Sequence, residues 1–289
     1  MSEDKYTAVW VSYSSITDFL TCPRLYYLKN IYRDPKTGHK IKIINPPLAL
    51  GQAIHEVIEE ISLLPKDERF NQPLMERLER VWKKISGRRG GFIDIESELK
   101  YKRRAELMIN RIIKNPGPLK NLAVKINQET PYFWLSKEDN IILCGKIDWL
   151  EYLPDTDSVH IIDFKTSKNE ESPDSLQLSI YYLLAVNCQR HPVSKASYWY
   201  LERSNEMVEK PLPNLKKSQE KILAMAKQIK LARQLERFKC SHKNGCSACQ
   251  PFEKILRGEA EFVGIDELRS DIYVLDKTDE ERKKASIIL

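Results

Sequence analysis

The sequence predicts an α/β fold in which helices flank a mixed central sheet, and two observations support that prediction. Two strand-like segments, Ile147–Leu153 and Val159–Lys165, are separated by turn-forming residues at 154–157, which predicts a β-hairpin. Segments with the apolar spacing of helices come before this hairpin and after it. A chain of 289 residues is long enough to bury one sizeable core or two small ones.

The remaining elements follow from helix breakers, turn formers and apolar periodicity. Ser172 or Asp174 is suited to cap a helix that runs to Cys188. In chain order we expect a helix at 12–33, a loop at 34–47, helices at about 48–63, 71–86 and 94–115, strands near 122–134, 141–153 and 159–165, a helix at 173–188, a strand at 196–202 and a helix near 214–238. Residues 64–118 would form a helical insertion. After Gly258 the chain is charged and sparsely apolar, which predicts a short appendage and a frayed tail.

The predicted hairpin brings two carboxylates together. Centred between residues 155 and 156, it places Asp148 opposite Asp163, and Lys165 lies on the same face as Asp163 because side chains alternate along a strand. Like charges so placed are destabilising and favour a bound cation, and oxygen ligands suit Mg²⁺ or Mn²⁺. A neighbouring lysine can orient water, so this pattern is typical of metal-dependent phosphodiester hydrolysis. A bulge would instead move Asp148 to the other face, and a solvated strand would carry the same residues without catalysis.

Two further groups of polar residues lie on predicted helices. Gln177 and Tyr181 are four residues apart and share one helix face. Gly51, His55 and Glu59 also share a face, where an imidazole could ligate a metal and a glycine would leave room for a phosphate or backbone. Both groups also have a simpler interpretation. Gln177 would be a solvated helix residue and Tyr181 a packing residue, and His55 would be structural.

The charge of the chain permits nucleic-acid binding without requiring it. Lysine and arginine number 47 against 41 acidic residues, a net charge of +6. Basic residues gather at 88–89 and 100–104, where they either contact phosphates or form a solvated face. The sequence has no Gly-x4-Gly-Lys-Ser/Thr loop, so ATP-driven unwinding of DNA would need a helicase partner.

Taken in series, these motifs resemble the RecB-type branch of the PD-(D/E)XK nuclease superfamily. The matching segments are Gly51-x3-His55-x3-Glu59, Gly145-x2-Asp148, Asp163-x-Lys165 and Gln177-x3-Tyr181. The N-terminal segment 11–27, with Cys22-Pro23 in it, is similar to the opening of the iron–sulfur members of that branch, which include the AddB nuclease domain and CRISPR-associated exonucleases. The resemblance implies a restriction-endonuclease-like core within a nuclease domain at 1–257, followed by an appendage and tail at 258–289.

The resemblance also implies roles for individual residues. Four groups would hold a metal ion, namely His55, Asp148, Asp163 and the carbonyl of Phe164. Lys165 would position the attacking water, and Gln177 and Tyr181 would contact DNA or support the lysine. Glu129 matches a further acidic residue of the family only loosely.

The activity expected from the resemblance is a metal-dependent DNA exonuclease that degrades single-stranded ends in repair or recombination. One alternative is a nuclease that trims DNA during CRISPR adaptation, with an integrase partner. Another is a DNA-binding module that keeps the fold without catalysis. The polar start and the lack of an apolar run of ~18 residues predict a cytoplasmic protein with neither a signal peptide nor a membrane span.

Six cysteines complete the pattern, and in a cytosolic setting they favour metal binding over disulfides. Cys240, Cys246 and Cys249 lie within ten residues, and Cys22 is the candidate for a distant fourth ligand. The resemblance implies a [4Fe–4S] cluster held by these four. The spacing Cys-x5-Cys-x2-Cys is the reverse of the family's Cys-x2-Cys-x5-Cys, and four thiolates also suit Zn²⁺, with His242 able to replace one of them. Cys144 and Cys188 are expected to be inert packing residues.

Overall fold

The computed structural model describes residues 4–275 and divides the chain into two compact units. The first unit comprises residues 4–17, 50–83 and 102–237, and the second comprises 18–49, 84–101 and 238–275. The frayed tail expected after residue 275 lies outside the described residues. Within the described range, no helix is long and apolar enough to cross a membrane.

The first unit is built on a four-stranded mixed sheet in the order β5-β6-β7-β8. Its strands are Trp149–Leu153, Ser158–Lys165, Val193–Tyr200 and Val208–Lys210. β5 and β6 form the predicted antiparallel hairpin, whereas β6 and β7 run parallel because helix α6, Gln177–Cys188, connects them as a crossover. All but the last residue of β6 are buried, as expected for a central strand covered on both faces. This mixed sheet confirms the predicted α/β class.

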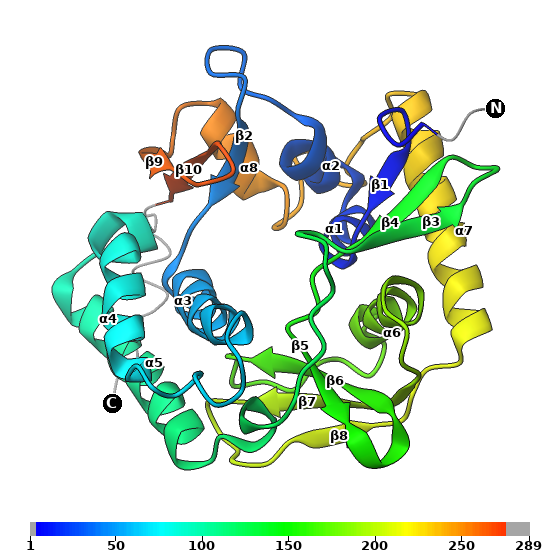
Figure 1. Ribbon diagram of the computed structural model, residues 1–289. Helices are drawn as coiled ribbons and strands as arrows, with labels where there is room; N and C mark the ends of the chain where they lie inside the picture. Colours follow the sequence, from blue (N-terminus) through cyan, green and yellow to red (C-terminus); the bar gives the residue numbers. More distant parts are fainter. Residues whose placement is uncertain (1–3, 276–289) are drawn as a thin grey trace. The chain divides into compact units, whose positions relative to one another are not determined.

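A second sheet of the same unit has three strands in the order β1-β4-β3. They are Val9–Val11, Ile141–Cys144 and Tyr132–Ser136, and β1 runs parallel to β4. Helix α6 packs against β3 of this sheet and also against β6 and β7, so it lies between the two sheets (Figure 1). Its buried residues therefore face apolar surface on several sides, which explains why the helix is apolar around most of its circumference.

Four other helices are close to the predicted ones, namely α3 Pro46–Ser62, α4 Leu74–Ile85, α5 Ile95–Lys114 and α7 Leu215–Gln234. Helix α8, Gln250–Leu256, was not predicted, and α1 Tyr13–Thr21 and α2 Pro23–Tyr26 fall within one predicted helix. The single helix predicted at 12–33 is wrong, because the chain breaks at Cys22-Pro23 and continues through a π-helical turn, Tyr27–Ile31. Proline lacks an amide hydrogen and pushes the preceding residue into an extended conformation, and Cys22 has φ −166°.

Three other expectations are corrected by the structure. Helix α6 begins at Gln177 rather than at 173, and neither Ser172 nor Asp174 caps it, since its N-cap is Leu176. The strand expected at 122–134 is reduced to β3 and an isolated bridge at Ala123. The strand expected at 141–153 is interrupted at residues 145–148, which separates β4 from β5.

The second unit contains a three-stranded sheet in the order β2-β10-β9. Its strands are Lys40–Ile43, Ser270–Val274 and Glu261–Ile265, so the segment expected to be a loop at 34–47 contains a strand. Strand β2 pairs with β10 although some 230 residues separate them along the chain. The domain boundary at residue 257 stays a prediction, but residues after it share a sheet with residues before it.

The apolar core of the second unit surrounds two of the cysteines. Its buried residues are Cys22, Leu25, Leu28, Ile41, Cys249, Phe252 and Ile255. These residues come from α2, the π-helical turn, β2 and the α8 region. Two of the four cysteines, Cys22 and Cys249, therefore belong to the hydrophobic core of this unit, and Cys240 and Cys246 pack against it.

Candidate active site

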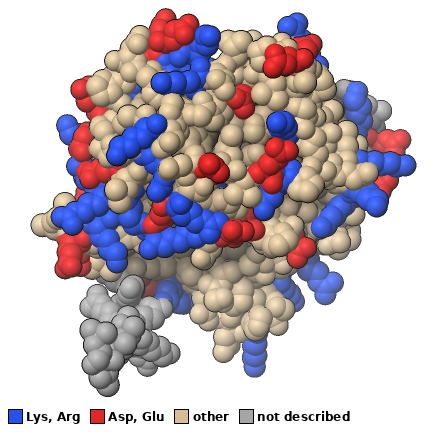
Figure 2. Space-filling view, turned by 90° about the horizontal axis from the view of Figure 1, so that it is seen from below, with Lys and Arg blue, Asp and Glu red and all other residues tan. Residues whose placement is uncertain are grey.

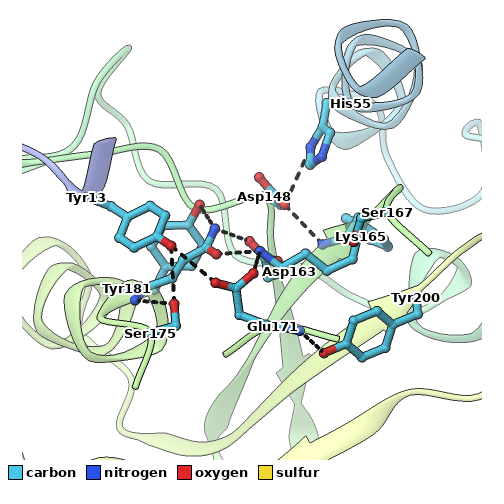
Figure 3. Close-up of polar contacts among 12 residues, drawn as sticks. Tyr13, His55, Asp148, Asp163, Lys165, Ser167, Glu171, Ser175, Tyr181 and Tyr200 are labelled. Atoms are coloured by element: carbon cyan, nitrogen blue, oxygen red, sulfur yellow. Dashed lines mark hydrogen bonds and ion pairs between the residues drawn. The ribbon is translucent and has the colours of Figure 1, made fainter. Parts of the chain in front are cut away.

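The register of the β5–β6 hairpin is the predicted one. Trp149 pairs with Ile162, so Asp148, which directly precedes β5, lies across from Asp163. The Asp148 Oδ2 atom accepts a hydrogen bond of 3.0 Å from the backbone N–H of Phe164. Figure 3 shows the two carboxylates and Lys165 directed toward one region at the end of the hairpin strands.

Lys165 is surrounded by oxygen acceptors. Its Nζ lies 2.9 Å from Asp163 Oδ2 and 3.0 Å from Glu171 Oε2, and it donates a hydrogen bond to Gln177 Oε1. The ammonium also lies 5.1 Å from the centre of the Tyr198 ring. Burial lowers the pKa of Lys165, but the Asp163 and Glu171 carboxylates outweigh burial and raise it. Lys165 therefore stays protonated although its side chain is largely buried, because the two carboxylates stabilise the ammonium.

Gln177 joins the lysine to the carboxylate. It begins helix α6, and its Nε2 donates hydrogen bonds to Asp163 Oδ1 at 2.6 Å and to the Tyr181 hydroxyl at 3.1 Å. Tyr181 follows one helical turn later, as the four-residue spacing predicted. Burial raises the pKa of Tyr181, and the nearby Asp148 and Asp163 charges raise it further. Both side chains are buried, so Gln177 is not a solvated helix residue.

His55 approaches the same carboxylates from helix α3. Its Nδ1 lies 3.5 Å from Asp148 Oδ2. Burial alone lowers the pKa of His55, but the Asp148 carboxylate outweighs it and raises the pKa. Glu59, on the same helix face, does not enter the site, because it pairs with Lys146.

Both motif glycines allow close packing around the site. A Cβ atom on Gly51, one turn before His55, would lie 3.3 Å from the Thr166 Oγ1 atom, next to Lys165. A Cβ atom on Gly145 would lie 3.0 Å from a methyl carbon of Leu184 on α6. The glycines therefore let α3 and the β4–β5 segment approach their neighbours closely.

Asp163 is the most strongly perturbed group of the site. Its side chain is 1% exposed, and burial raises the pKa of its carboxyl to about 7, with the Asp148 charge adding to the effect. Its Oδ2 atom makes no hydrogen bond to any described residue, and its close partner is the Lys165 ammonium. A buried carboxylate oxygen, a second carboxylate and an imidazole form a donor set that fits Mg²⁺ or Mn²⁺.

Several residues of the site were not predicted from the sequence. Glu171 contacts Lys165 from the loop after β6, and its other oxygen accepts a hydrogen bond of 3.2 Å from the Tyr13 hydroxyl. The Glu171 N–H donates to the Tyr200 hydroxyl at 3.0 Å. Tyr198 and Tyr200 alternate on β7, the strand parallel to β6, and this alternation is a signal that was available in the sequence. No pattern in the sequence indicates Glu171.

Glu129, the loosely matched acidic residue, makes none of the contacts described for the site. It is exposed and lies in the bend before β3. Some residues of the predicted basic clusters pair with acids, since Lys102 lies 2.8 Å from Glu79 and Arg104 lies 2.5 Å from Glu202. Figure 2 likewise shows basic and acidic side chains intermixed over the face in view.

The four predicted metal-binding cysteines converge in the second unit. The sulfur atoms of Cys22, Cys240, Cys246 and Cys249 all lie within 4.8 Å of one another. His242 is not a member of this group, although its Nδ1 lies 4.0 Å from the Cys240 sulfur. A group of four thiols so close together can bind a metal ion.

Cys144 and Cys188 lie in the first unit, outside the group of four. Burial raises the pKa of Cys144 to about 11 and also raises the pKa of Cys188, whose thiol donates to the carbonyl of Tyr132.

The fold and the arrangement of two carboxylates and a lysine are typical of metal-dependent phosphodiesterases. The family model of the PD-(D/E)XK nuclease superfamily matches residues 10–252, and the chain therefore belongs to that superfamily. Members of this superfamily are generally nucleases that use divalent metals. A comparison with curated proteins gives no match.

Proposed function

We propose that the protein is a Mg²⁺- or Mn²⁺-dependent deoxyribonuclease that acts as an exonuclease, favours single-stranded ends and serves DNA repair or recombination. The convergence of Asp148, Asp163 and Lys165 at the end of one hairpin is the observation that supports it most. Membership in the superfamily supports nuclease activity. The preference for ends and for single strands rests on the resemblance to RecB-type exonucleases.

In this proposal, His55, Asp148, Asp163 and the Phe164 carbonyl hold the metal ion. When bound, a divalent cation supplies Lewis-acid stabilisation of the charge that develops on the phosphate. The buried Oδ2 of Asp163 and the close approach of His55 to Asp148 support the assignment of these ligands.

Lys165 would orient the attacking water and offset negative charge as it develops. Gln177 supports this role because its amide contacts both Lys165 and Asp163, which restricts the lysine to one position. Tyr181 would in turn orient the amide of Gln177 through its hydroxyl. We therefore assign Gln177 and Tyr181 to positioning the lysine rather than to contacting DNA.

Cleavage of four labelled DNA substrates with and without Mn²⁺ tests the proposal. The substrates are linear single strands labelled at either end, linear duplex, and closed single-stranded circles. We expect metal-dependent release of mononucleotides or short fragments from linear single strands, and circles that stay intact. Efficient cutting of circles would indicate an endonuclease. DNA binding without cleavage, whichever metal is added, would indicate that the protein is a non-catalytic DNA-binding module with the nuclease fold.

A CRISPR-adaptation nuclease is the second candidate within the same chemistry. It would trim DNA ends to a defined length, and it would need an integrase partner. Addition of such an integrase should then change the length of the products, whereas a repair exonuclease would be stimulated by a helicase that supplies single strands.

The resemblance to the iron–sulfur branch also predicts a [4Fe–4S] cluster at the four cysteines, but the distances between their sulfur atoms support a different metal.

A further inference from the structure

The four-cysteine group has dimensions that discriminate between kinds of metal centre. All its sulfur atoms lie within 4.8 Å of one another, and the Cys246 and Cys249 sulfurs are 3.7 Å apart. Two segments distant in the sequence, at Cys22 and at 240–249, supply the ligands. The pairwise distances between the sulfurs can therefore be compared with those that different centres require.

A single tetrahedral ion accounts for these distances. Zinc binds cysteine sulfur at about 2.3 Å, so the edge of a regular ZnS₄ tetrahedron is about 3.8 Å. The measured Cys246–Cys249 separation of 3.7 Å is nearly this edge. The remaining separations, at most 4.8 Å, exceed it by no more than about 1 Å.

A [4Fe–4S] cluster requires a wider arrangement of cysteines. Each thiolate of a cubane binds a different iron, and the metal–sulfur bonds diverge from the centre of the cube. For equal metal–sulfur bond lengths, two cysteine sulfurs of a cubane are farther apart than two sulfurs of a single-ion site by the distance between two irons. The sulfur–sulfur distances here exceed those of a single-ion site by about 1 Å at most, which is less than half of one metal–sulfur bond of about 2.3 Å. Two metal atoms cannot lie that close together, so the sulfurs do not fit the cubane.

The backbone around Cys246 and Cys249 forms a compact turn that brings their two sulfurs together. The backbone N–H of Cys246 donates a hydrogen bond of 3.2 Å to the Cys249 sulfur. Gly245 has φ +81°, a left-handed conformation, and a Cβ atom there would lie 3.2 Å from the Cys249 sulfur. A Cys-x2-Cys pair in a tight turn occurs in zinc sites and in iron–sulfur sites alike, so the sulfur–sulfur distances decide between the two.

We propose that Cys22, Cys240, Cys246 and Cys249 bind one Zn²⁺ ion in a closed, redox-inert structural site. Four thiolates complete a tetrahedral shell, so no position is open for substrate or water. The ion joins the start of α2 to the segment before α8 at the core of the second unit. This inference concerns a site separate from the proposed nuclease centre, and it replaces the iron–sulfur cluster that the resemblance to the RecB-type branch implies.

Metal analysis of the full-length protein tests the proposal independently of nuclease activity. The protein is expressed in medium supplemented with both iron and zinc, purified without oxygen, and assayed for zinc, iron and acid-labile sulfide. We expect one zinc per chain, no sulfide and a colourless protein. Four irons with sulfide, or one iron without sulfide in place of zinc, would overturn the proposal.

Reconstitution of the metal-free protein provides a second measurement. Cobalt(II) should give the intense visible bands of a tetrahedral thiolate complex, and Zn²⁺ should displace it with a rise in melting temperature. Assembly of a cubane from Fe³⁺, sulfide and a thiol reductant, with a melting temperature above that of the zinc protein, would contradict the inference. The Cys246→Ser variant should lose the cobalt spectrum, and the matched variants Cys144→Ser and Cys188→Ser should keep it.

Discussion

Glu171 and Lys165 form an ion pair with an oxygen–nitrogen distance of 3.0 Å, and the glutamate comes from a loop rather than from a motif. An ammonium has three hydrogens, and Lys165 faces three acceptors, namely Asp163, Glu171 and Gln177. Glu171 is itself held by the hydroxyl of Tyr13 and by its own N–H to Tyr200. The loop therefore takes part in fixing the position of the lysine.

Substitution of Glu171 should slow catalysis without weakening DNA binding. Hydrogen bonds to charged groups contribute about 1.5–3 kcal/mol, so Glu171→Ala should lower kcat roughly tenfold or more. Glu171→Gln keeps an oxygen acceptor for the lysine and should recover part of the loss. Steady-state kinetics on end-labelled DNA would separate kcat from KM.

The neighbouring residue offers a control for that experiment. Glu170 is exposed and pairs with Arg203 instead of the lysine, so Glu170→Ala should have nearly wild-type kinetics. Equal losses in both variants would mean that the loop acts only through its general charge. A rise in KM with unchanged kcat in Glu171→Ala would place the residue in substrate binding.

Asp163→Ala should abolish metal-dependent cleavage while DNA binding survives. The reason is the place of Asp163 between Asp148 and Lys165, where the proposed metal needs its buried oxygen. Gel-shift and cleavage assays on the same preparation measure both properties. Asp174→Ala, in an exposed position before α6, is the matched control. Near-normal cleavage by well-folded Asp163→Ala protein would refute the assignment.

Lys165→Ala should reduce the rate by at least ~10²-fold, the scale found when one preorganised donor is removed from an active site. Lys165→Arg should not restore activity, because a planar guanidinium cannot replace a compact ammonium among three oxygens. Lys168→Ala serves as the control, since this exposed lysine lies outside the site and pairs with Glu202 at 3.8 Å. Single-turnover rates provide the measurement. Full activity of the arginine variant would mean that only positive charge is required.

The pairing of Asp148 with Asp163 could be predicted because a hairpin has few registers. Once the turn residues at 154–157 are recognised, the strict alternation of side chains determines which residues face one another. The helical spacing of Gln177 and Tyr181 was predictable for the same reason. Glu171 was not, because its position depends on the path of an irregular loop and on a tyrosine about 160 residues earlier in the chain.

The second unit was predicted less well than the first. Its strands β2, β9 and β10 have at most five residues each and carry charged residues among the apolar ones. They are stabilised by pairing between the two ends of the sequence, and periodicity within one segment contains no information about such pairing. The break at Cys22-Pro23 was missed because the apolar pattern continues past it, although proline is a known signal.

The face of the sheet opposite Asp163 carries a buried polar chain that crosses β5, β6 and β7. Glu151 lies directly opposite His160, and its Oε2 is 3.0 Å from His160 Nδ1. The other ring nitrogen is 2.8 Å from the Ser197 hydroxyl, and Asn121 donates to the remaining Glu151 oxygen at 2.6 Å. The chain links three neighbouring strands, one of which carries Asp163 and Lys165, so it holds their register.

Glu151 should make the stability of the protein sensitive to acid. Burial by itself raises the pKa of Glu151, but the hydrogen bonds with His160 and Asn121 outweigh burial and lower it below the ordinary 4.5. A carboxyl whose pKa is lower in the folded state stabilises the fold above its unfolded pKa, and this contribution is lost as the pH falls through the folded pKa. Glu151→Gln should therefore cost about 2 kcal/mol near neutral pH, and the difference from wild type should shrink below about pH 4.5.

Urea unfolding of both proteins across this pH range, with the free energy of unfolding compared at each pH, measures the effect. Glu209→Gln, an exposed glutamate on the edge strand β8, should match wild type throughout and shows what loss of one surface charge does. Since the pKa of Glu151 is lower in the folded protein than in the unfolded chain, removal of the carboxyl must change the slope of stability with pH as well as its value. A difference between Glu151→Gln and wild type that stays constant from neutral to acid pH would show that packing at this position matters and that the charge does not.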